Sequence, residues 1–205
     1  MRVKEGRLIN SSAPLKFTFD DKEFLGYEGD TLASALIAND VKVIGRSFKY
    51  HRPRGVMTDG SHEPNGLVEI RDGNQTTPNV RLTTQELVSD LKIYSQNYWG
   101  TLKWDLLELN DLISPFLSAG FYYKTFMWPK KFWEALYEPS IRRAAGLGRL
   151  SMANNSDYYE KAYAFCDVLV IGSGPAGIMA ALTAANAGAK VIFCEEDSIF
   201  GGRLN

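Results

Sequence analysis

The residues whose types and spacing best indicate chemistry lie near the carboxyl end of the chain. Residues 172–177 read Gly-Ser-Gly-Pro-Ala-Gly and fit the pattern G-x-G-x-x-G. In such a loop Gly172 permits a tight turn, Gly174 lets a pyrophosphate approach the backbone, and Gly177 brings the next helix close to the preceding strand. The candidate cofactor-binding residues are Gly172, Ser173, Gly174, Pro175, Ala176, Gly177 and Glu195.

Three elements must position this loop. The apolar run 167–171 predicts a parallel strand buried on both faces, and the alanine-rich segment 178–186 predicts a helix that Gly188 ends. A second strand is expected over residues 190–194. Phosphates would lie at the positive end of the helix, so the segment predicts the first βαβ unit of an α/β Rossmann-like dinucleotide-binding domain. A glycine-rich structural turn is the alternative.

A carboxylate completes this pattern. Glu195 follows the second predicted strand, about 20 residues after the loop, where a carboxylate accepts hydrogen bonds from the adenosine ribose. An arginine there would instead indicate a 2'-phosphate. Glu196 is expected to point the other way into solvent, because side chains alternate along a strand. The motif alone does not distinguish NAD from FAD.

Other residues with chemical potential are sparse. His51 and His62 have no cluster of cysteine or histidine at metal-ligand spacing, so no metal site is predicted. Cys166 and Cys194 should be buried thiols at opposite ends of adjacent strands, roughly 13 Å or more apart and beyond disulfide reach. No Ser/His/Asp arrangement is recognisable, so the catalytic residues are unknown.

The composition excludes several classes of protein. Hydrophobic residues make up 45% and charged residues 23% of the 205 residues, as in soluble globular proteins. The 23 basic and 24 acidic residues give a net charge of -1, which argues against nucleic-acid binding. No segment has the length and apolarity of a signal peptide or a membrane span, so we expect a cytoplasmic protein without membrane contact.

The first part of the chain predicts a small α+β domain. Alternating residues at 15–19 and 23–27 flank a turn and predict an antiparallel hairpin. A helix capped by Asp30 or Thr31 should follow, and a strand returns at 66–70 after a long irregular segment. Hairpin, helix, long loop and strand are typical, in this order, of a β-grasp domain.

Aromatic residues concentrate between Tyr94 and Tyr137, which include all four tryptophans. This density predicts either a surface pressed against another domain or subunit, or an ordinary aromatic core. Pro115, Pro129 and Pro139 should divide the segment into short helices. We therefore expect a β-grasp domain over residues 1–92, an aromatic-rich helical connector over 93–160 with a linker at 147–157, and the start of the dinucleotide-binding domain over 161–205.

One loop is rich in basic and aromatic residues. Its members are Lys42, Arg46, Phe48, Lys49, Tyr50, His51, Arg52 and Arg54. The pattern is similar to a surface for single-stranded nucleic acid, but the balanced net charge favours a solvated or subunit-facing loop. A role near a flavin or dinucleotide phosphate stays open.

Four segments together resemble one family. They are residues 46–55 (RSFKYHRPRG), 63–65 (EPN), 119–129 (AGFYYKTFMWP) and 138–146 (EPSIRRAAG). These segments are similar to the amino-terminal part of the alpha subunit of heterotetrameric sarcosine oxidase, and the resemblance covers essentially the whole chain.

This resemblance implies a function that composition does not show. The family's flavin-dependent enzymes oxidise sarcosine to glycine and reduce oxygen to hydrogen peroxide, and the one-carbon unit leaves as formaldehyde or passes to tetrahydrofolate. The resemblance implies that the alpha subunit binds NAD, that FAD and FMN belong to the assembled complex, and that the partners are the beta, gamma and delta subunits. Because the amine is oxidised in another subunit, this chain alone is expected to be inactive.

The β-grasp segment departs from its iron-sulfur relatives at the cluster positions. Those relatives carry a C-x4-C-x2-C motif, and counting from Pro53 puts Thr58, Glu63 and Gly66 at the three cysteine positions. None supplies a thiolate, so we expect a ferredoxin-like domain without an iron-sulfur cluster. The alternatives are a non-catalytic assembly module and a related FAD/NAD-dependent amine or opine oxidoreductase subunit, including a reductase that uses the dinucleotide in turnover.

Overall fold

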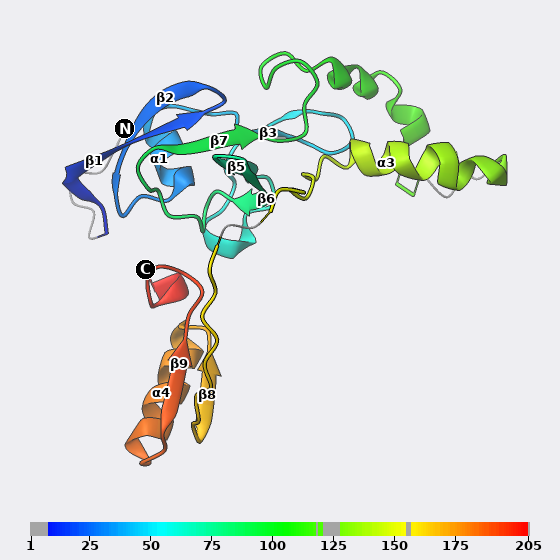
Figure 1. Cartoon of the computed structure of the whole chain (residues 1–205). Coiled ribbons are helices and arrows are strands. Elements are labelled where there is room, and N and C mark those ends of the chain that lie inside the picture. The colour runs from blue at the N-terminus through cyan, green and yellow to red at the C-terminus, as the bar shows by residue number, and fades with distance from the viewer. Residues whose placement is uncertain (1–7, 118, 121–127, 155–156, 205) are drawn as a thin grey trace. The chain divides into compact units, whose positions relative to one another are not determined.

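The computed structural model describes residues 8–117, 119–120, 128–154 and 157–204. The chain separates into two compact units, unit 1 over residues 1–154 and unit 2 over residues 155–205. Each unit has its own main sheet (Figure 1). The expected three-part division at residues 92 and 160 stays a prediction.

Unit 1 is built on a five-stranded mixed sheet. β1 (Asn10–Phe19) and β2 (Lys22–Glu28) form the predicted antiparallel hairpin, in which Phe17 pairs with Phe24. In contrast, β1 and β7 (Leu91–Ser95) run parallel. The hairpin turn places Asp20 and Asp21 at positive φ, which aspartate tolerates better than most residues. In spatial order the strands are β2 (Lys22–Glu28), β1 (Asn10–Phe19), β7 (Leu91–Ser95), β5 (Leu67–Asp72) and β6 (Gln75–Arg81).

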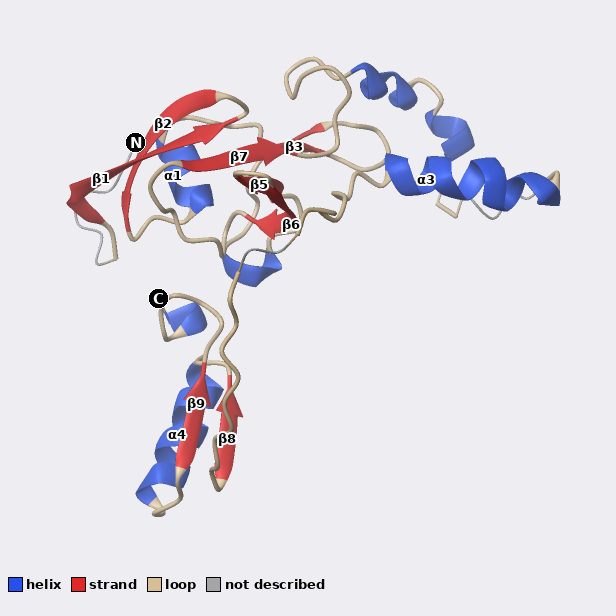
Figure 2. Cartoon of the chain, in the orientation of Figure 1, coloured by secondary structure: helices blue, strands red, loops and turns tan. Residues whose placement is uncertain are grey.

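Helix α1 (Leu32–Ala38) packs on this sheet and completes the β-grasp arrangement (Figure 2). Thr31 caps the helix, because its hydroxyl accepts the N–H of Ser34 while the Ser34 hydroxyl accepts the N–H of Thr31. Leu32 and Leu36 are fully buried in the core. The predicted helix and its cap are confirmed.

Several strands of unit 1 escaped prediction. β6 is polar and contains Pro78, which fits an edge strand because proline has no N–H to donate, but which hides the strand pattern. The short strands β3 (Gly45–Arg46) and β4 (Pro53–Arg54) pair antiparallel within the segment expected to be irregular. A 3-10 turn at Gly60–His62 follows them. These pairings hold the basic loop between β3 and β4.

The described part of the connector consists of short helical segments, as predicted. They are Leu106–Asp111, Ser114–Leu117, Lys130–Phe132, Trp133–Tyr137 and α3 (Glu138–Ala144). Pro139 opens α3 rather than breaking it, since proline is tolerated in the first turn of a helix. The four tryptophans are 36% to 82% exposed, so the aromatic-core interpretation is wrong for them.

Unit 2 is a βαβ unit followed by a short turn. Its elements are β8 (Val168–Ile171), α4 (Pro175–Asn186), β9 (Val191–Cys194) and a 3-10 turn at Gly202–Leu204. The two strands run parallel, with Val168 opposite Val191, which confirms the predicted unit. Helix α4 packs on both strands. Leu169 and Ile171 are nevertheless exposed, so the expected burial of β8 on both faces is wrong here.

The segment that precedes β8 has little regular structure. Between Leu147 and Cys166, the described residues contain no helix and no strand, in agreement with the linker expected at 147–157. None of the helices in the described ranges is long and apolar enough to cross a membrane.

Candidate functional site

The glycine loop leaves β8 and enters α4. Gly172 has a φ of +94°, in the left-handed region that favours glycine. A Cβ atom on Gly177 would lie 1.8 Å from the carbonyl oxygen of Gly172, so only glycine allows helix and strand to approach this closely. A Cβ atom on Gly174 would meet no heavy atom within 4 Å. The space beside Gly174 is therefore open, as the approach of a ligand requires.

The first turn of α4 begins at this loop without a side-chain cap. Gly174 is the N-cap residue, and Pro175 and Ala176 open the helix. Proline suits the first position because its missing N–H would have no partner within the helix. The positive end of the helix dipole is thus not compensated by a capping side chain, and such helix ends bind phosphate groups.

Glu195 lies beside the glycine loop. Its carboxylate accepts a short hydrogen bond from the N–H of Ser173, and also accepts the N–H groups of Glu196 at 2.8 Å and Asp197 at 3.1 Å. Hydrogen bonds to the ionised form, led by one from the side chain of Ser173, lower the pKa of Glu195 to about 2. The carboxylate keeps further lone pairs for ribose hydroxyls. Glu196 is exposed, as predicted.

Two glycines that were not predicted pack against this loop. The N–H of Gly201 donates to the hydroxyl oxygen of Ser173 at 2.9 Å, and Ser173 is fully buried. Gly202 has positive φ, and a Cβ atom there would lie 3.3 Å from the Cα atom of Gly174. The Gly-Gly pair shortly after β9 is the signal that sequence reasoning missed. Binding by any of the predicted site residues stays a prediction.

The three positions expected for cluster cysteines also converge in the structure. Glu63 is buried, and its carboxylate accepts the N–H groups of Met57 and Thr58. A Cβ atom on Gly66 would lie 3.1 Å from the Cγ atom of Glu63. Thr58, Glu63 and Gly66 thus lie close together, and their side chains are a hydroxyl, a carboxylate and a hydrogen. Their alignment with the cysteine positions stays a prediction.

Both units match known families. Residues 12–98 match the family described as 2Fe-2S iron-sulfur cluster binding domain, which covers the sheet of unit 1. Residues 167–205 match the family described as FAD dependent oxidoreductase, which covers the glycine loop and Glu195. The chain therefore combines a ferredoxin-like domain with an FAD-oxidoreductase region.

Two longer proteins are similar to nearly the whole chain. Sarcosine oxidase subunit alpha of Rhizobium meliloti (strain 1021) is 57% identical over 203 residues, 99% of this chain and 21% of the relative. The chain is a homologue of sarcosine oxidase subunit alpha. That of Corynebacterium sp. (strain U-96) is 28% identical over 97% of this chain and 16% of the relative, so the chain spans about a fifth or less of these relatives. The resemblance seen in the sequence is confirmed.

A solved structure gives a more distant likeness. The crystal structure of L-proline dehydrogenase from P. horikoshii is similar over 96% of this chain and 28% of that chain, with 21% sequence identity and a TM-score of 0.48.

In this sarcosine oxidase alpha homologue, part of the basic loop is buried inside unit 1. Arg46 is buried and donates hydrogen bonds to the carbonyl oxygens of Leu102, Lys103 and His51. The Nδ1 atom of His51, which is fully buried, lies 2.6 Å from a carboxylate oxygen of Asp105. The prediction of a solvated or subunit-facing loop is therefore wrong for Arg46 and His51, because the connector covers them.

The remaining candidates are possible metal ligands and the two cysteines. Across the described residues, no group of three or more histidine, cysteine, aspartate or glutamate side chains could hold a metal ion. Cys194 ends β9 opposite Ile171 whereas Cys166 precedes β8, so the thiols lie at opposite ends of the strands, as predicted. Cys194 is exposed and Cys166 partly exposed, so the prediction of buried thiols is wrong: Cys194 is the last residue of β9 and Cys166 precedes β8, both at the ends of the small sheet.

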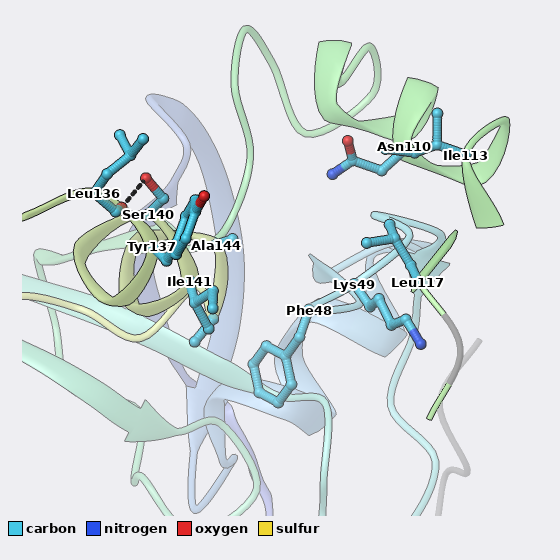
Figure 3. A pocket seen from close by; sticks show the side chains of 11 residues that line it. Phe48, Lys49, Asn110, Ile113, Leu117, Leu136, Tyr137, Ser140, Ile141 and Ala144 are labelled. Atoms are coloured by element: carbon cyan, nitrogen blue, oxygen red, sulfur yellow. Dashed lines mark hydrogen bonds between the residues drawn. The ribbon is translucent and has the colours of Figure 1, made fainter. Parts of the chain in front are cut away.

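Unit 1 also contains an open apolar cavity of about 590 Å³ (Figure 3). Leu136, Tyr137 and Ile141 line it from the helical run that ends in α3, opposite Ile113 and Leu117. The hydroxyl of Ser140 donates to the carbonyl oxygen of Leu136 rather than to the cavity. Among the described lining residues Lys49 alone is charged.

Proposed function

We propose that this chain is the amino-terminal part of the alpha subunit of a heterotetrameric sarcosine oxidase, and that unit 2 binds the ADP half of NAD. One observation supports the binding role most strongly. The open space beside Gly174, the uncapped start of α4 and the ionised carboxylate of Glu195 lie around one loop. A pyrophosphate and an adenosine ribose need these groups.

Each chemical part of the ADP group has a proposed partner. The pyrophosphate lies over Gly174 and accepts hydrogen bonds from N–H groups of the loop and the first turn of α4. The ribose hydroxyls donate to Glu195. A 2'-phosphate would meet a carboxylate of like charge, so the site disfavours NADP. The groups described around the glycine loop match the ADP part of the dinucleotide, so the proposal concerns this part.

The choice between NAD and FAD rests on two different arguments. The match of residues 167–205 to FAD dependent oxidoreductases supports a flavin, because FAD shares the ADP group. The resemblance to the alpha subunits of sarcosine oxidases implies NAD in this subunit. We place NAD here, and FAD and FMN elsewhere in the complex.

The complex would convert sarcosine, oxygen and water into glycine, formaldehyde and hydrogen peroxide, a two-electron oxidation of the N-methyl group. When tetrahydrofolate is present, it would receive the one-carbon unit. Flavins bound in the complex would accept the electron pair and pass it to oxygen. This chain would bind a dinucleotide and make subunit contacts in a cytoplasmic enzyme.

The connector supplies the proposed contact surface for the beta, gamma or delta subunit. Trp99, Trp104 and Trp128 are 64%, 76% and 82% exposed, and Leu112 and Phe116 are also exposed. Exposed aromatic and aliphatic side chains at this density mark protein interfaces. The helical segments of the connector extend from the sheet of unit 1 (Figure 1).

Co-purification and nucleotide analysis test this function. The chain, produced together with its candidate partner subunits, should form a stable complex that contains flavin and NAD. This complex should form peroxide when sarcosine is supplied. The chain alone should form no peroxide from sarcosine. A complex without bound nucleotide would instead support an assembly module, and NADH oxidation by the chain alone would support a reductase.

A further inference from the structure

The segment from Met57 to Gly66 closes around a single buried side chain. Glu63 is 1% exposed, although it lies in a loop with little regular structure. One carboxylate oxygen accepts the N–H groups of Met57 and Thr58, both at 2.7 Å. The other accepts the N–H group of Asn65, also at 2.7 Å. Three backbone donors from both sides of the loop thus converge on one negative charge.

A 2Fe-2S cluster does not fit these residues, although residues 12–98 match a cluster-binding family. Such a cluster requires thiolate ligands, and the chain's two cysteines, Cys166 and Cys194, lie outside the matched range. The space is also taken, since a Cβ atom on Gly66 would approach Glu63 to 3.1 Å. The loop therefore offers backbone donors around a carboxylate where relatives offer thiolates.

We propose that Glu63 replaces the cluster as the anionic centre of this loop. The converging N–H groups of Met57, Thr58 and Asn65 form an anion-binding site, and the chain fills it with its own carboxylate. The loop then folds without iron, and the ferredoxin-like domain keeps its shape as a scaffold rather than as an electron carrier. This inference is independent of the dinucleotide site.

The charge state of Glu63 agrees with this arrangement. Burial alone would raise the pKa of its carboxyl group. The backbone N–H groups of Thr58, Met57, Asn65 and Gly66 outweigh burial and hold the pKa below its ordinary value. Glu63 is therefore ionised at neutral pH, and the N–H groups around it are satisfied by a charge rather than by a neutral acid.

Replacing the carboxylate and supplying it again from solution tests the proposal. In the Glu63→Ala variant of the whole chain, the amides of the 57–66 segment should exchange with deuterium at least about tenfold faster than in the wild type. Added formate, which fits the vacated site, should slow this exchange in a saturable way. Chloride at the same ionic strength should not, because it lacks the two oxygens that divide the donors between them.

Two further variants separate this role from general stability. Asp30→Ala removes another buried carboxylate of the same domain, which accepts the N–H of Tyr27. The Asp30→Ala variant should speed amide exchange in the turn from Tyr27 to Asp30. In this variant formate should not change the exchange of residues 57–66. Glu63→Gln keeps the shape but turns an NH2 group toward backbone donors, so it should also speed exchange, without formate rescue because the side chain fills the space.

Three results would overturn the proposal. One is unchanged exchange in Glu63→Gln, which also decides the matter if Glu63→Ala fails to fold. Another is an equal effect of formate on the wild type and on Glu63→Ala. The third is uptake of iron and sulfide by the wild type during anaerobic reconstitution, with the visible absorption of a 2Fe-2S cluster.

Discussion

A methyl group added at Gly177 has no room between helix α4 and strand β8. It would lie 1.8 Å from the carbonyl oxygen of Gly172, whereas real Cβ contacts essentially never fall below 3.0 Å. Helix and loop must therefore separate by more than 1 Å in the Gly177→Ala variant. A gap of this size forfeits a large part of the dispersion energy of the atoms that line it.

The expected loss of stability is about 2 kcal/mol. Overpacking of this kind costs about 3 kcal/mol, and alanine regains at most about 1 kcal/mol over glycine inside a helix. Gly174→Ala is the matched control, because its new methyl group meets no atom within 4 Å and its φ of −64° suits alanine. Its stability should stay within about 0.5 kcal/mol of the wild type.

Hydrogen exchange measures the local stability of the Gly177→Ala and Gly174→Ala variants, and calorimetry measures their affinity for ADP-ribose. Gly177→Ala should speed amide exchange across residues 168–186 by about thirtyfold, the equivalent of 2 kcal/mol, and weaken ADP-ribose binding as a consequence. Gly174→Ala should leave exchange unchanged and still weaken ADP-ribose binding, because the methyl group stands where the pyrophosphate approaches. Unchanged exchange in Gly177→Ala would refute the packing argument, and unchanged affinity in Gly174→Ala would refute the ligand position.

Three more outcomes are expected. Glu195→Ala should lower NAD affinity of the complex about tenfold, whereas Glu196→Ala, at an exposed side chain, should not; equal effects in calorimetry would contradict the ribose assignment. The lowered pKa of Glu195 contributes stability that is fully present above its ordinary value of 4.5 and is lost as pH falls toward about 2. NAD affinity should therefore be the same at pH 7 and at about pH 6. A lower affinity at about pH 6 would show that a group other than Glu195 controls binding. Asp105→Ala removes the buried hydrogen-bond partner of His51 and should lower the free energy of unfolding by about 1 to 3 kcal/mol, measured by urea unfolding followed by tryptophan fluorescence. Trp104→Ser should leave this stability unchanged and weaken subunit association, and the reverse pattern would contradict both assignments.

Local signals in the sequence were sufficient for the elements nearest the candidate site. Gly172 and Gly177 predicted the turn and the close packing of α4, because a positive φ and the absence of a Cβ atom are properties of glycine itself. The hairpin around Asp20 and the cap at Thr31 were predictable for the same reason. In each case residues within one turn of chain determine the geometry.

The sequence could not reveal pairings between distant segments. The parallel contact of β1 with β7 joins residues more than 70 positions apart. The sequence of β6 has no recognisable strand pattern, because its residues are mostly polar and include Pro78. Gly201 was overlooked because its partner, Ser173, lies 28 residues earlier. Nothing in the local pattern near either residue indicates that the turn after β9 closes on the glycine loop.

The sequence by itself determined the family, the βαβ unit and the absence of thiolates at Thr58, Glu63 and Gly66, since these depend on residue identity and short spacing. Only the tertiary structure decided what occupies the place of those thiolates and which basic residues are buried. The sequence identifies Glu63 only as a residue that cannot supply a thiolate, and Arg46 as one of several basic residues of a loop. Their burial depends on backbone N–H and carbonyl groups that the fold brings to them, and the types of neighbouring residues do not record the directions of those groups.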